Sequence, residues 1–199
     1  KETLETDTCR KCQQTSETIE HITGGCKLLA GTEYTERHNT AAKIIHQELA
    51  YKHKLIETET PYYRYTPQNV LENKTHKLYW DRTVHTDRTV TSNRPDITLI
   101  DKVHQETFII DVAIPNDTNV ITKEQEKITK YLPLAIEVKE LWQQHKATIV
   151  PLIISVTGVT SKNFLQHLKK LDIHPYLHTK IQKAVLLKTA SITRTFLQQ

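Results

Sequence analysis

Apolar residues recur at helical spacing in four segments of this chain, at 35–56, 122–145, 161–171 and 176–197. In the first two segments, charged residues separate the apolar ones, which is the pattern of an amphipathic helix that packs on a sheet. Pro133 lies inside the second segment, so we expect that helix to kink or break near Lys130. The pattern therefore predicts two long helices and two closing helices.

Four other runs are rich in apolar and β-branched residues and are typical of strands, at 80–90, 96–100, 107–114 and 148–156. Residues 101–105 are interpreted as a hairpin turn, so the first three runs are predicted to form a meander. The fourth run follows a crossover helix and should lie parallel to an earlier strand. Residues 57–78 hold Pro61 and Pro67 and are interpreted as a connecting segment.

This order of elements predicts a mixed α/β fold. The chain has 199 residues and is 37% apolar, which is enough for one sizeable core and a small satellite module. No window approaches the roughly 18 apolar residues of a membrane span, so we expect a soluble protein. The chain contains no Met, even at its first position, and we interpret it as part of a longer protein.

All three cysteines lie within the first 26 residues, with a histidine among them. The four residues are spaced as Cys9-x2-Cys12-x8-His21-x4-Cys26. Three thiolates and one imidazole close a tetrahedral Zn²⁺ shell; the alternative is a set of reduced cysteines without a metal. Gly24 and Gly25 are expected to fold the backbone back and deliver Cys26. A segment this small cannot build a core, so Zn²⁺ would supply most of its folding free energy.

Two aspartates stand at the ends of short apolar runs. Asp96 closes Arg94-Pro95-Asp96, and Asp111 follows after fourteen intervening residues. At this separation the two carboxylates can meet at the rim of a hairpin and share a divalent cation, and such a cation, open to water, cleaves phosphodiesters. The alternative is a pair of ordinary strand-end carboxylates, which is less favoured because Asp is a poor strand former.

Positive charge concentrates at the C-terminal end of the chain. Residues 161–199 carry 7 Lys and Arg against 1 Asp, a net charge of +6, within an overall net charge of +4. This stretch could contact a phosphate backbone or form a solvated helix face. The cluster Tyr62-Tyr63-Arg64-Tyr65 likewise could stack on bases or pack on the core, and packing is favoured.

Together these features resemble the restriction-like endonuclease domain at the C-terminal end of site-specific non-LTR retrotransposon polyproteins, within the PD-(D/E)xK nuclease superfamily. The matching residues are the knuckle with Cys9, Cys12, His21 and Cys26, then Arg94-Pro95-Asp96, Asp111 and Lys127-x-x-Lys130-Tyr131. The resemblance covers nearly the whole chain. It implies a zinc knuckle at residues 1–34 and a restriction-like endonuclease domain at residues 35–199.

One position departs from the superfamily pattern. Ala113 stands two residues after the second acid, where the superfamily usually has Lys. The resemblance implies that a displaced lysine from the following helix replaces it, and Lys127 and Lys130 are the two candidates. Lys127 falls in the helical stripe that faces the sheet, whereas Lys130 is slightly off that stripe.

The remaining roles follow from the resemblance. Asp96 and Asp111, with the backbone carbonyl of Val112, would hold Mg²⁺ or Mn²⁺, and a lysine would orient the water or stabilise charge on the phosphate. Arg94 would contact the scissile DNA backbone or pair with an acid. Glu48, on the preceding helix, is a candidate additional ligand.

The implied function is a nuclear, metal-dependent endonuclease that nicks double-stranded target DNA, so that the exposed 3′ end primes reverse transcription. Its further partners would be the element RNA and the upstream reverse transcriptase of the same polyprotein, with no membrane involved. Two other interpretations remain open. The first is a nucleic-acid-binding module whose nuclease core has lost activity, and the second is a zinc-braced protein-interaction domain.

Overall fold

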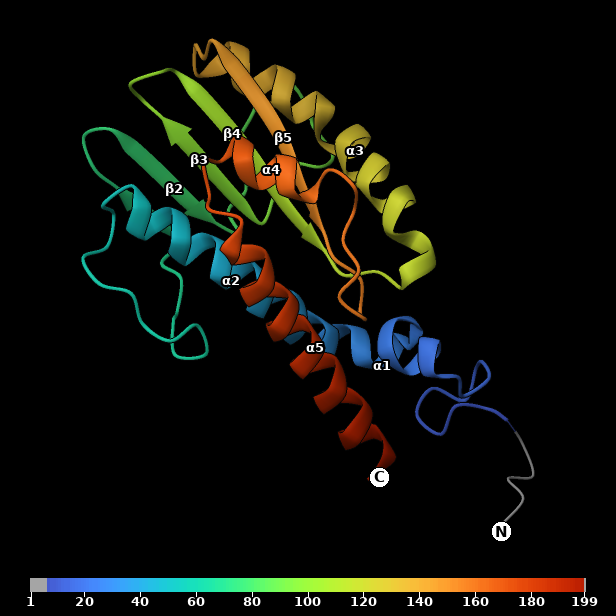
Figure 1. The fold of residues 1–199 in the computed structure, drawn as a ribbon. Helices are drawn as coiled ribbons and strands as arrows, with labels where there is room; N and C mark the ends of the chain where they lie inside the picture. The colour runs from blue at the N-terminus through green and yellow to red at the C-terminus, as the bar shows by residue number, and fades with distance from the viewer. Residues whose placement is uncertain (1–6, 199) are drawn as a thin grey trace.

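A five-stranded sheet flanked by helices forms the centre of the molecule (Figure 1). The computed structural model describes residues 7–198. The strands are β1 (Val70–Glu72), β2 (His76–Trp80), β3 (Ile97–Asp101), β4 (Glu106–Ala113) and β5 (Lys146–Ile153). They lie in the order β1-β2-β3-β4-β5, antiparallel from β1 to β4, with β5 parallel to β4. The predicted mixed α/β class is confirmed.

The helices cover both faces of this sheet. The longer ones are α2 (Thr35–Lys52), α3 (Val120–Leu141), α4 (Phe164–Lys170) and α5 (Tyr176–Leu197). The shorter ones are η1 (His21–Gly25), α1 (Lys27–Leu29), η2 (Ala30–Tyr34) and η3 (Asp117–Asn119). In Figure 1, α5 runs beside α2 and ends near the N-terminal segment.

Side chains alternate along β4, so successive residues contact helices on opposite faces of the sheet. Ile110 and Val112 pack in the main core with residues of α2, α4 and α5. Ile109 points to the other face, where it packs with Tyr131 and Leu134 of α3. Asp111 has the parity of Ile109, so the strand presents it to the α3 face.

The predicted strand at 80–90 is wrong, because only Trp80 belongs to β2 and residues 81–96 form a loop. This loop contains two valines that pack against α3, which gives it the apolar spacing of a strand. Val84 is 5% exposed, and Val90 packs beside it. The interpretation of residues 57–78 as a connecting segment is wrong in its last part, which contains β1 and the start of β2. The side chain of Asn73 closes the turn between them by accepting bonds from the amides of Thr75 and His76 at 2.9 and 2.8 Å.

Of the kink or break predicted near Lys130, a break is wrong, because α3 continues through Pro133 as one helix. Pro133 lies on the exposed side of α3. Water can therefore bond the carbonyl that proline leaves without an amide partner.

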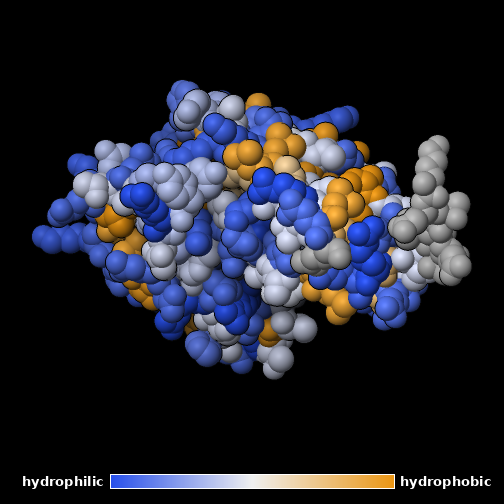
Figure 2. Space-filling view, turned by 90° about the horizontal axis from the view of Figure 1, so that it is seen from below, coloured by the Kyte–Doolittle hydropathy of each residue, from blue (hydrophilic) through white to orange (hydrophobic). Residues whose placement is uncertain are grey.

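No helix within residues 7–198 is long and apolar enough to cross a membrane. Hydrophilic residues cover most of the face seen from below, and the hydrophobic residues on it form separate areas (Figure 2).

The same substitution, Ile to Ala, should change the free energy of unfolding by very different amounts at a buried and at an exposed position. Ile110→Ala should lower the free energy of unfolding by about 2–5 kcal/mol, because Ile110 is fully buried in the central strand β4. Ile121→Ala, on α3, should change it by less than about 0.5 kcal/mol, since Ile121 is 74% exposed. Equilibrium unfolding in urea measures both values, and equal losses would contradict the burial described above.

Candidate metal centre and acidic site

The four predicted zinc ligands lie together near the N-terminus. The ligand atoms of Cys9, Cys12, His21 and Cys26 are all within 4.8 Å of one another, and Cys12 Sγ lies 3.3 Å from His21 Nε2. Bond lengths of about 2.3 Å to sulfur and 2.1 Å to nitrogen place tetrahedral ligands about 3.6 Å apart. The three cysteines are free thiols. This Cys3His cluster therefore fits Zn²⁺ in ligand type, number and spacing.

The first two cysteines sit on a tight turn, as the sequence predicts. The amide of Cys9 donates to Thr15 O at 2.7 Å, the amide of Gln13 donates to Cys9 O at 2.8 Å, and Gln13 has a φ of 53°. A hydrogen bond with the backbone of Gln14 lowers the pKa of Cys12 to about 6. A thiol with this pKa is largely a thiolate near neutral pH, which is the form that binds metal.

Gly24 and Gly25 act differently from the prediction. Both lie in the helical turn η1, and neither adopts the left-handed backbone that a reversal would require. A Cβ on Gly24 would collide with the side chain of Asn116. Gly24 therefore lies in close contact with the segment after β4.

The Cys3His cluster also packs on the C-terminal end of α5. Cys9 and Cys26 share a buried apolar cluster with Ile192 and Phe196. The hydroxyl of Tyr34 accepts a bond from the Cys26 amide at 3.2 Å and donates to Ile22 O at 2.7 Å. These contacts attach the small N-terminal segment to the rest of the molecule. The division into domains at residues 1–34 and 35–199 stays a prediction.

A second group of predicted residues meets at the open end of the β3–β4 hairpin. Ile97 of β3 pairs with Ile110 of β4, so Asp96 directly precedes the paired residues of β3 and Asp111 directly follows Ile110 in β4. Besides burial, the negative charge of Asp96 raises the pKa of Asp111, so the two carboxylates are near each other. The amide of Val112 donates to Asp96 Oδ2 at 2.7 Å. The structure thus brings the two aspartates together.

Lys127 from α3 contacts this pair. Its Nζ lies 2.7 Å from Asp111 Oδ2, and the two side chains are 16% and 3% exposed. Burial raises the pKa of Asp111, and the neighbouring charge of Asp96 raises it further, while Lys127 opposes both effects. Asp111 Oδ2 makes no hydrogen bond of good geometry beyond this ion pair. A buried carboxylate oxygen is therefore left with one partner, an ammonium group.

Lys130 and Tyr131 lie beside this group. Lys130 is exposed, and its Nζ donates to the Tyr131 hydroxyl at 3.1 Å. Tyr131 is 1% exposed and donates to Arg94 O at 3.2 Å, and its pKa is raised by burial and by the charge of Asp111. Of the two lysine candidates, Lys127 is the one in direct contact with an acid.

Arg94 forms an ion pair with Asp81, which is not one of the two aspartates of the acidic site. Its guanidinium donates to the two carboxylate oxygens of Asp81 at 2.8 and 2.7 Å, and both side chains are largely exposed. This bidentate contact closes the loop at residues 81–96 beside Asp96. The hydrogen bonds to Asp81 raise the pKa of Arg94, so its charge is constant.

His38 on α2 is a member of the acidic site that the sequence analysis missed. Its Nε2 lies 3.1 Å from Asp96 Oδ1. Burial lowers the pKa of His38, but the hydrogen bond with Asp96 and the charges of Asp96 and Asp111 outweigh this effect and raise it. Glu48, the predicted contribution of this helix, lies ten residues further along α2, about 15 Å of helix axis. The contact from α2 is therefore His38 and not Glu48.

Residues 7–198 contain one group of three or more closely spaced metal-binding side chains, the Cys3His cluster. The acidic site combines two carboxylates with one ammonium and one imidazole, and the nearby Tyr131 hydroxyl adds a neutral donor. Searches against models of known protein families and against curated proteins find no match to this chain.

Loss of a ligand should abolish metal binding by the Cys3His cluster. We expect the purified protein to hold about one Zn²⁺ per chain, and Cys26→Ser or His21→Asn to hold almost none, because three ligands bind far more weakly than four. His85→Asn, which replaces an exposed histidine in the loop at 81–96, is the matched control. Metal analysis after gel filtration measures the content. Equal zinc in all variants would rule out this cluster.

The buried ion pair predicts unequal effects of two lysine substitutions on one helix. Lys127→Met leaves Asp111 buried without its cation, so the free energy of unfolding should fall by about 3–5 kcal/mol. Lys123→Met removes an exposed pair with Glu126, with side chains 39% and 49% exposed, and should cost less than about 1 kcal/mol. Urea unfolding at pH 7 compares them, and a reversed order would contradict the geometry.

Proposed function

We propose that this chain is a metal-dependent DNA endonuclease of the PD-(D/E)xK type, from the C-terminal part of a non-LTR retrotransposon polyprotein. The observation that carries the proposal is the juxtaposition of Asp96, Asp111 and Lys127. Two carboxylates at the end of a β-hairpin can hold a divalent cation, and an ammonium group beside them can stabilise charge on a phosphodiester. The ammonium reaches the pair from α3, which supports the displaced-lysine pattern of the nucleases that the sequence resembles.

The residues present fit a hard divalent cation. Asp111 Oδ2 is buried and its one partner is the ammonium group of Lys127, so this oxygen keeps lone-pair capacity for Mg²⁺ or Mn²⁺. Asp96, Asp111 and the backbone carbonyl of Val112 would hold the ion. When bound, it supplies Lewis acidity and lowers the pKa of a coordinated water.

The protein's own groups would then perform three tasks. Asp96 and Asp111 would hold the cation, and so the phosphate that it attracts, at a fixed position relative to the sheet. Lys127 orients the attacking water or stabilises the negative charge that develops on the phosphate. Arg94, at the exposed entrance, contacts the DNA backbone when the strand displaces Asp81, or it holds the loop beside Asp96 in place.

In this proposal the substrate is double-stranded target DNA, and the cut strand primes reverse transcription in the nucleus. The element RNA and the upstream reverse transcriptase would be further partners. The basic helix α5 supports a polyanionic partner, because residues 176–197 contain Lys180, Lys183, Lys188 and Arg194 and no acid. The packing of the Cys3His cluster on α5 supports a bracing role for the zinc knuckle.

A second candidate is a nucleic-acid-binding module with an inactive nuclease core. Two observations favour it: Ala113 stands where the superfamily usually has its lysine, and both acids are already paired, Asp111 with Lys127 and Asp96 with His38. The described residues place no third carboxylate within ligand distance of the pair. Such a module would bind DNA without cutting it.

Nicking of supercoiled plasmid distinguishes the two candidates. With Mg²⁺ or Mn²⁺ the wild-type protein should convert plasmid to open circles, and Asp96→Asn and Asp111→Asn should reduce the rate by about 100-fold or more, since each removes a ligand of the ion. Asp87→Asn, an exposed residue of the neighbouring loop, is the matched control.

The nuclease proposal is lost if wild type and the two variants nick equally, because the activity would then come from a contaminant. A wild-type protein that binds DNA but never nicks it would establish the inactive module instead.

A further inference from the structure

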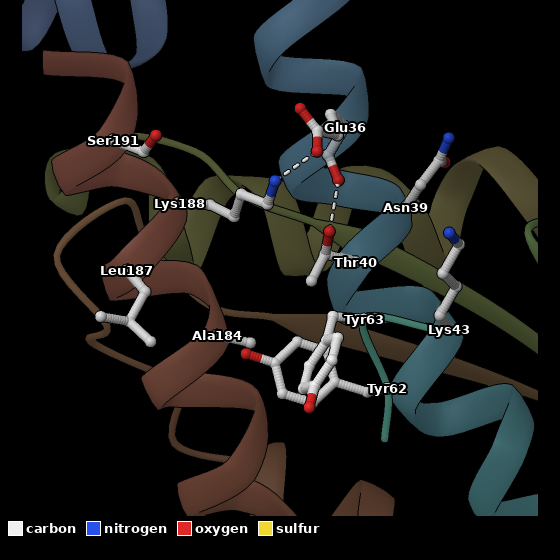
Figure 3. Close-up of a pocket in the computed structure, with 10 residues that line it drawn as sticks. All are labelled: Glu36, Asn39, Thr40, Lys43, Tyr62, Tyr63, Ala184, Leu187, Lys188 and Ser191. Carbon is white, nitrogen blue, oxygen red and sulfur yellow. Dashed lines mark hydrogen bonds and ion pairs between the residues drawn. The ribbon is translucent and has the colours of Figure 1, made fainter. Parts of the chain in front are cut away.

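A groove between α2 and α5 lies outside the acidic site and the Cys3His cluster (Figure 3). It has a volume of about 330 Å³. Asn39 and Lys43 of α2 form one wall, Lys188 of α5 forms the other, and Tyr62 and Tyr63 close one end. Aromatic and cationic side chains thus meet in one open hollow.

The tyrosines of the cluster at 62–65 have different roles. Tyr65 is bonded through its hydroxyl to His46 Nδ1 at 2.8 Å, and Tyr62 is half-buried against the main core. Tyr63 is 70% exposed and stands edge-on to Tyr62, with ring centroids 5.7 Å apart and an interplanar angle of 80°. Packing therefore explains Tyr62 and Tyr65, and it leaves the ring of Tyr63 unexplained.

The charges around Tyr63 are mainly positive. The guanidinium of Arg64 lies 5.9 Å from the Tyr63 ring centroid, and Lys43 makes no ion pair with any residue in 7–198. Lys188 is paired with Glu36, the one acid in the groove wall, and both side chains are partly exposed. Three cations against one acid give the groove and its edge a net charge of +2, which suits an anionic ligand.

The position of the groove relates it to the acidic site. His38, which contacts Asp96, and Asn39, which lines the groove, are adjacent on α2. Successive helical residues point about 100° apart, so the two features lie on neighbouring sides of one helix. A strand that occupied both features would cross α2.

We propose that this groove binds an unpaired polynucleotide strand, with one base stacked on Tyr63 and phosphates at Lys43 and Arg64. Aromatic rings and cations in an open groove are the combination by which proteins bind single strands without sequence readout. The proposal deepens the proposed nuclease function, which supplies the source of the strand, but strand binding itself requires neither the divalent ion nor the two aspartates.

The test is binding of fluorescein-labelled oligothymidine of about twelve nucleotides, within the usual site size, to the zinc-loaded full chain without added Mg²⁺. Fluorescence anisotropy gives the dissociation constant. Tyr63→Ala should weaken binding roughly tenfold, because one stacked base is lost, while Tyr63→Phe keeps the ring and the affinity. Tyr176→Ala is the matched control: Tyr176 is 71% exposed, lies at the start of α5 and does not line the groove.

Two further measurements identify the kind of polynucleotide that binds. Lys43→Gln should reduce the slope of log affinity against log salt by about 0.7, the value for one phosphate of a single strand. Oligouridine tests whether RNA serves as well as DNA, and a blunt duplex of equal length should be insensitive to Tyr63→Ala because its bases are already stacked.

Equal affinities for Tyr63→Ala and Tyr176→Ala would overturn the groove proposal, as would a Tyr63 effect of the same size on the duplex. A protein that binds the strand through Tyr63 but never nicks plasmid supports the groove and refutes the nuclease. A protein that nicks plasmid but binds the strand independently of Tyr63 gives the opposite result, so the two failures are distinguishable.

Discussion

The antiparallel register of β3 and β4 is the constraint on which the acidic site depends. Side chains alternate along a strand, so a shift of one residue would turn Asp111 to the opposite face and separate it from Asp96 and Lys127. The register is specified by the difference between the two faces, because Ile110 and Val112 pack in the main apolar core whereas Asp111 pairs with Lys127 of α3 on the other face. A slip of one residue would place the carboxylate of Asp111 in the apolar core without a partner.

Stability alone gives little reason for charges at this position. A buried ion pair gains attraction but loses hydration, and apolar residues of similar volume often stabilise a protein at least as well. Asp111 is 2% exposed and has a raised pKa, and Tyr131 beside it is 1% exposed with a raised pKa. Groups whose pKa values are shifted by burial together with specific charged partners concentrate at functional sites. This argument supports a chemical role for the pair, independently of any resemblance.

The sequence predicts those residues of the acidic site whose positions follow from short-range patterns. Asp96 and Asp111 lie on the two strands of one hairpin, and Lys127 falls on the inward stripe of the next helix, so short-range patterns place all three. His38 lies 58 residues before Asp96, and its contact depends on how α2 packs, which no local pattern encodes. The strands β1 and β2 are not predicted for a similar reason, because they are only three and five residues long and are defined by their pairing and by the Asn73 turn between them.

One path of contacts joins the Cys3His cluster to the acidic site. Tyr34 bonds the Cys26 amide, and the guanidinium of Arg37 lies 5.1 Å from the Tyr34 ring centroid. Arg37 is 2% exposed, donates to Thr189 of α5 at 3.0 Å, and has a pKa lowered by burial to about 10. The next residue along α2 is His38, which reaches Asp96. A cation buried at this junction requires its neighbours to stay in place, because any displacement leaves it without its few partners. The segment with the Cys3His cluster therefore contacts the start of α2 through Tyr34 and Arg37, and the start of α2 carries the histidine that contacts Asp96.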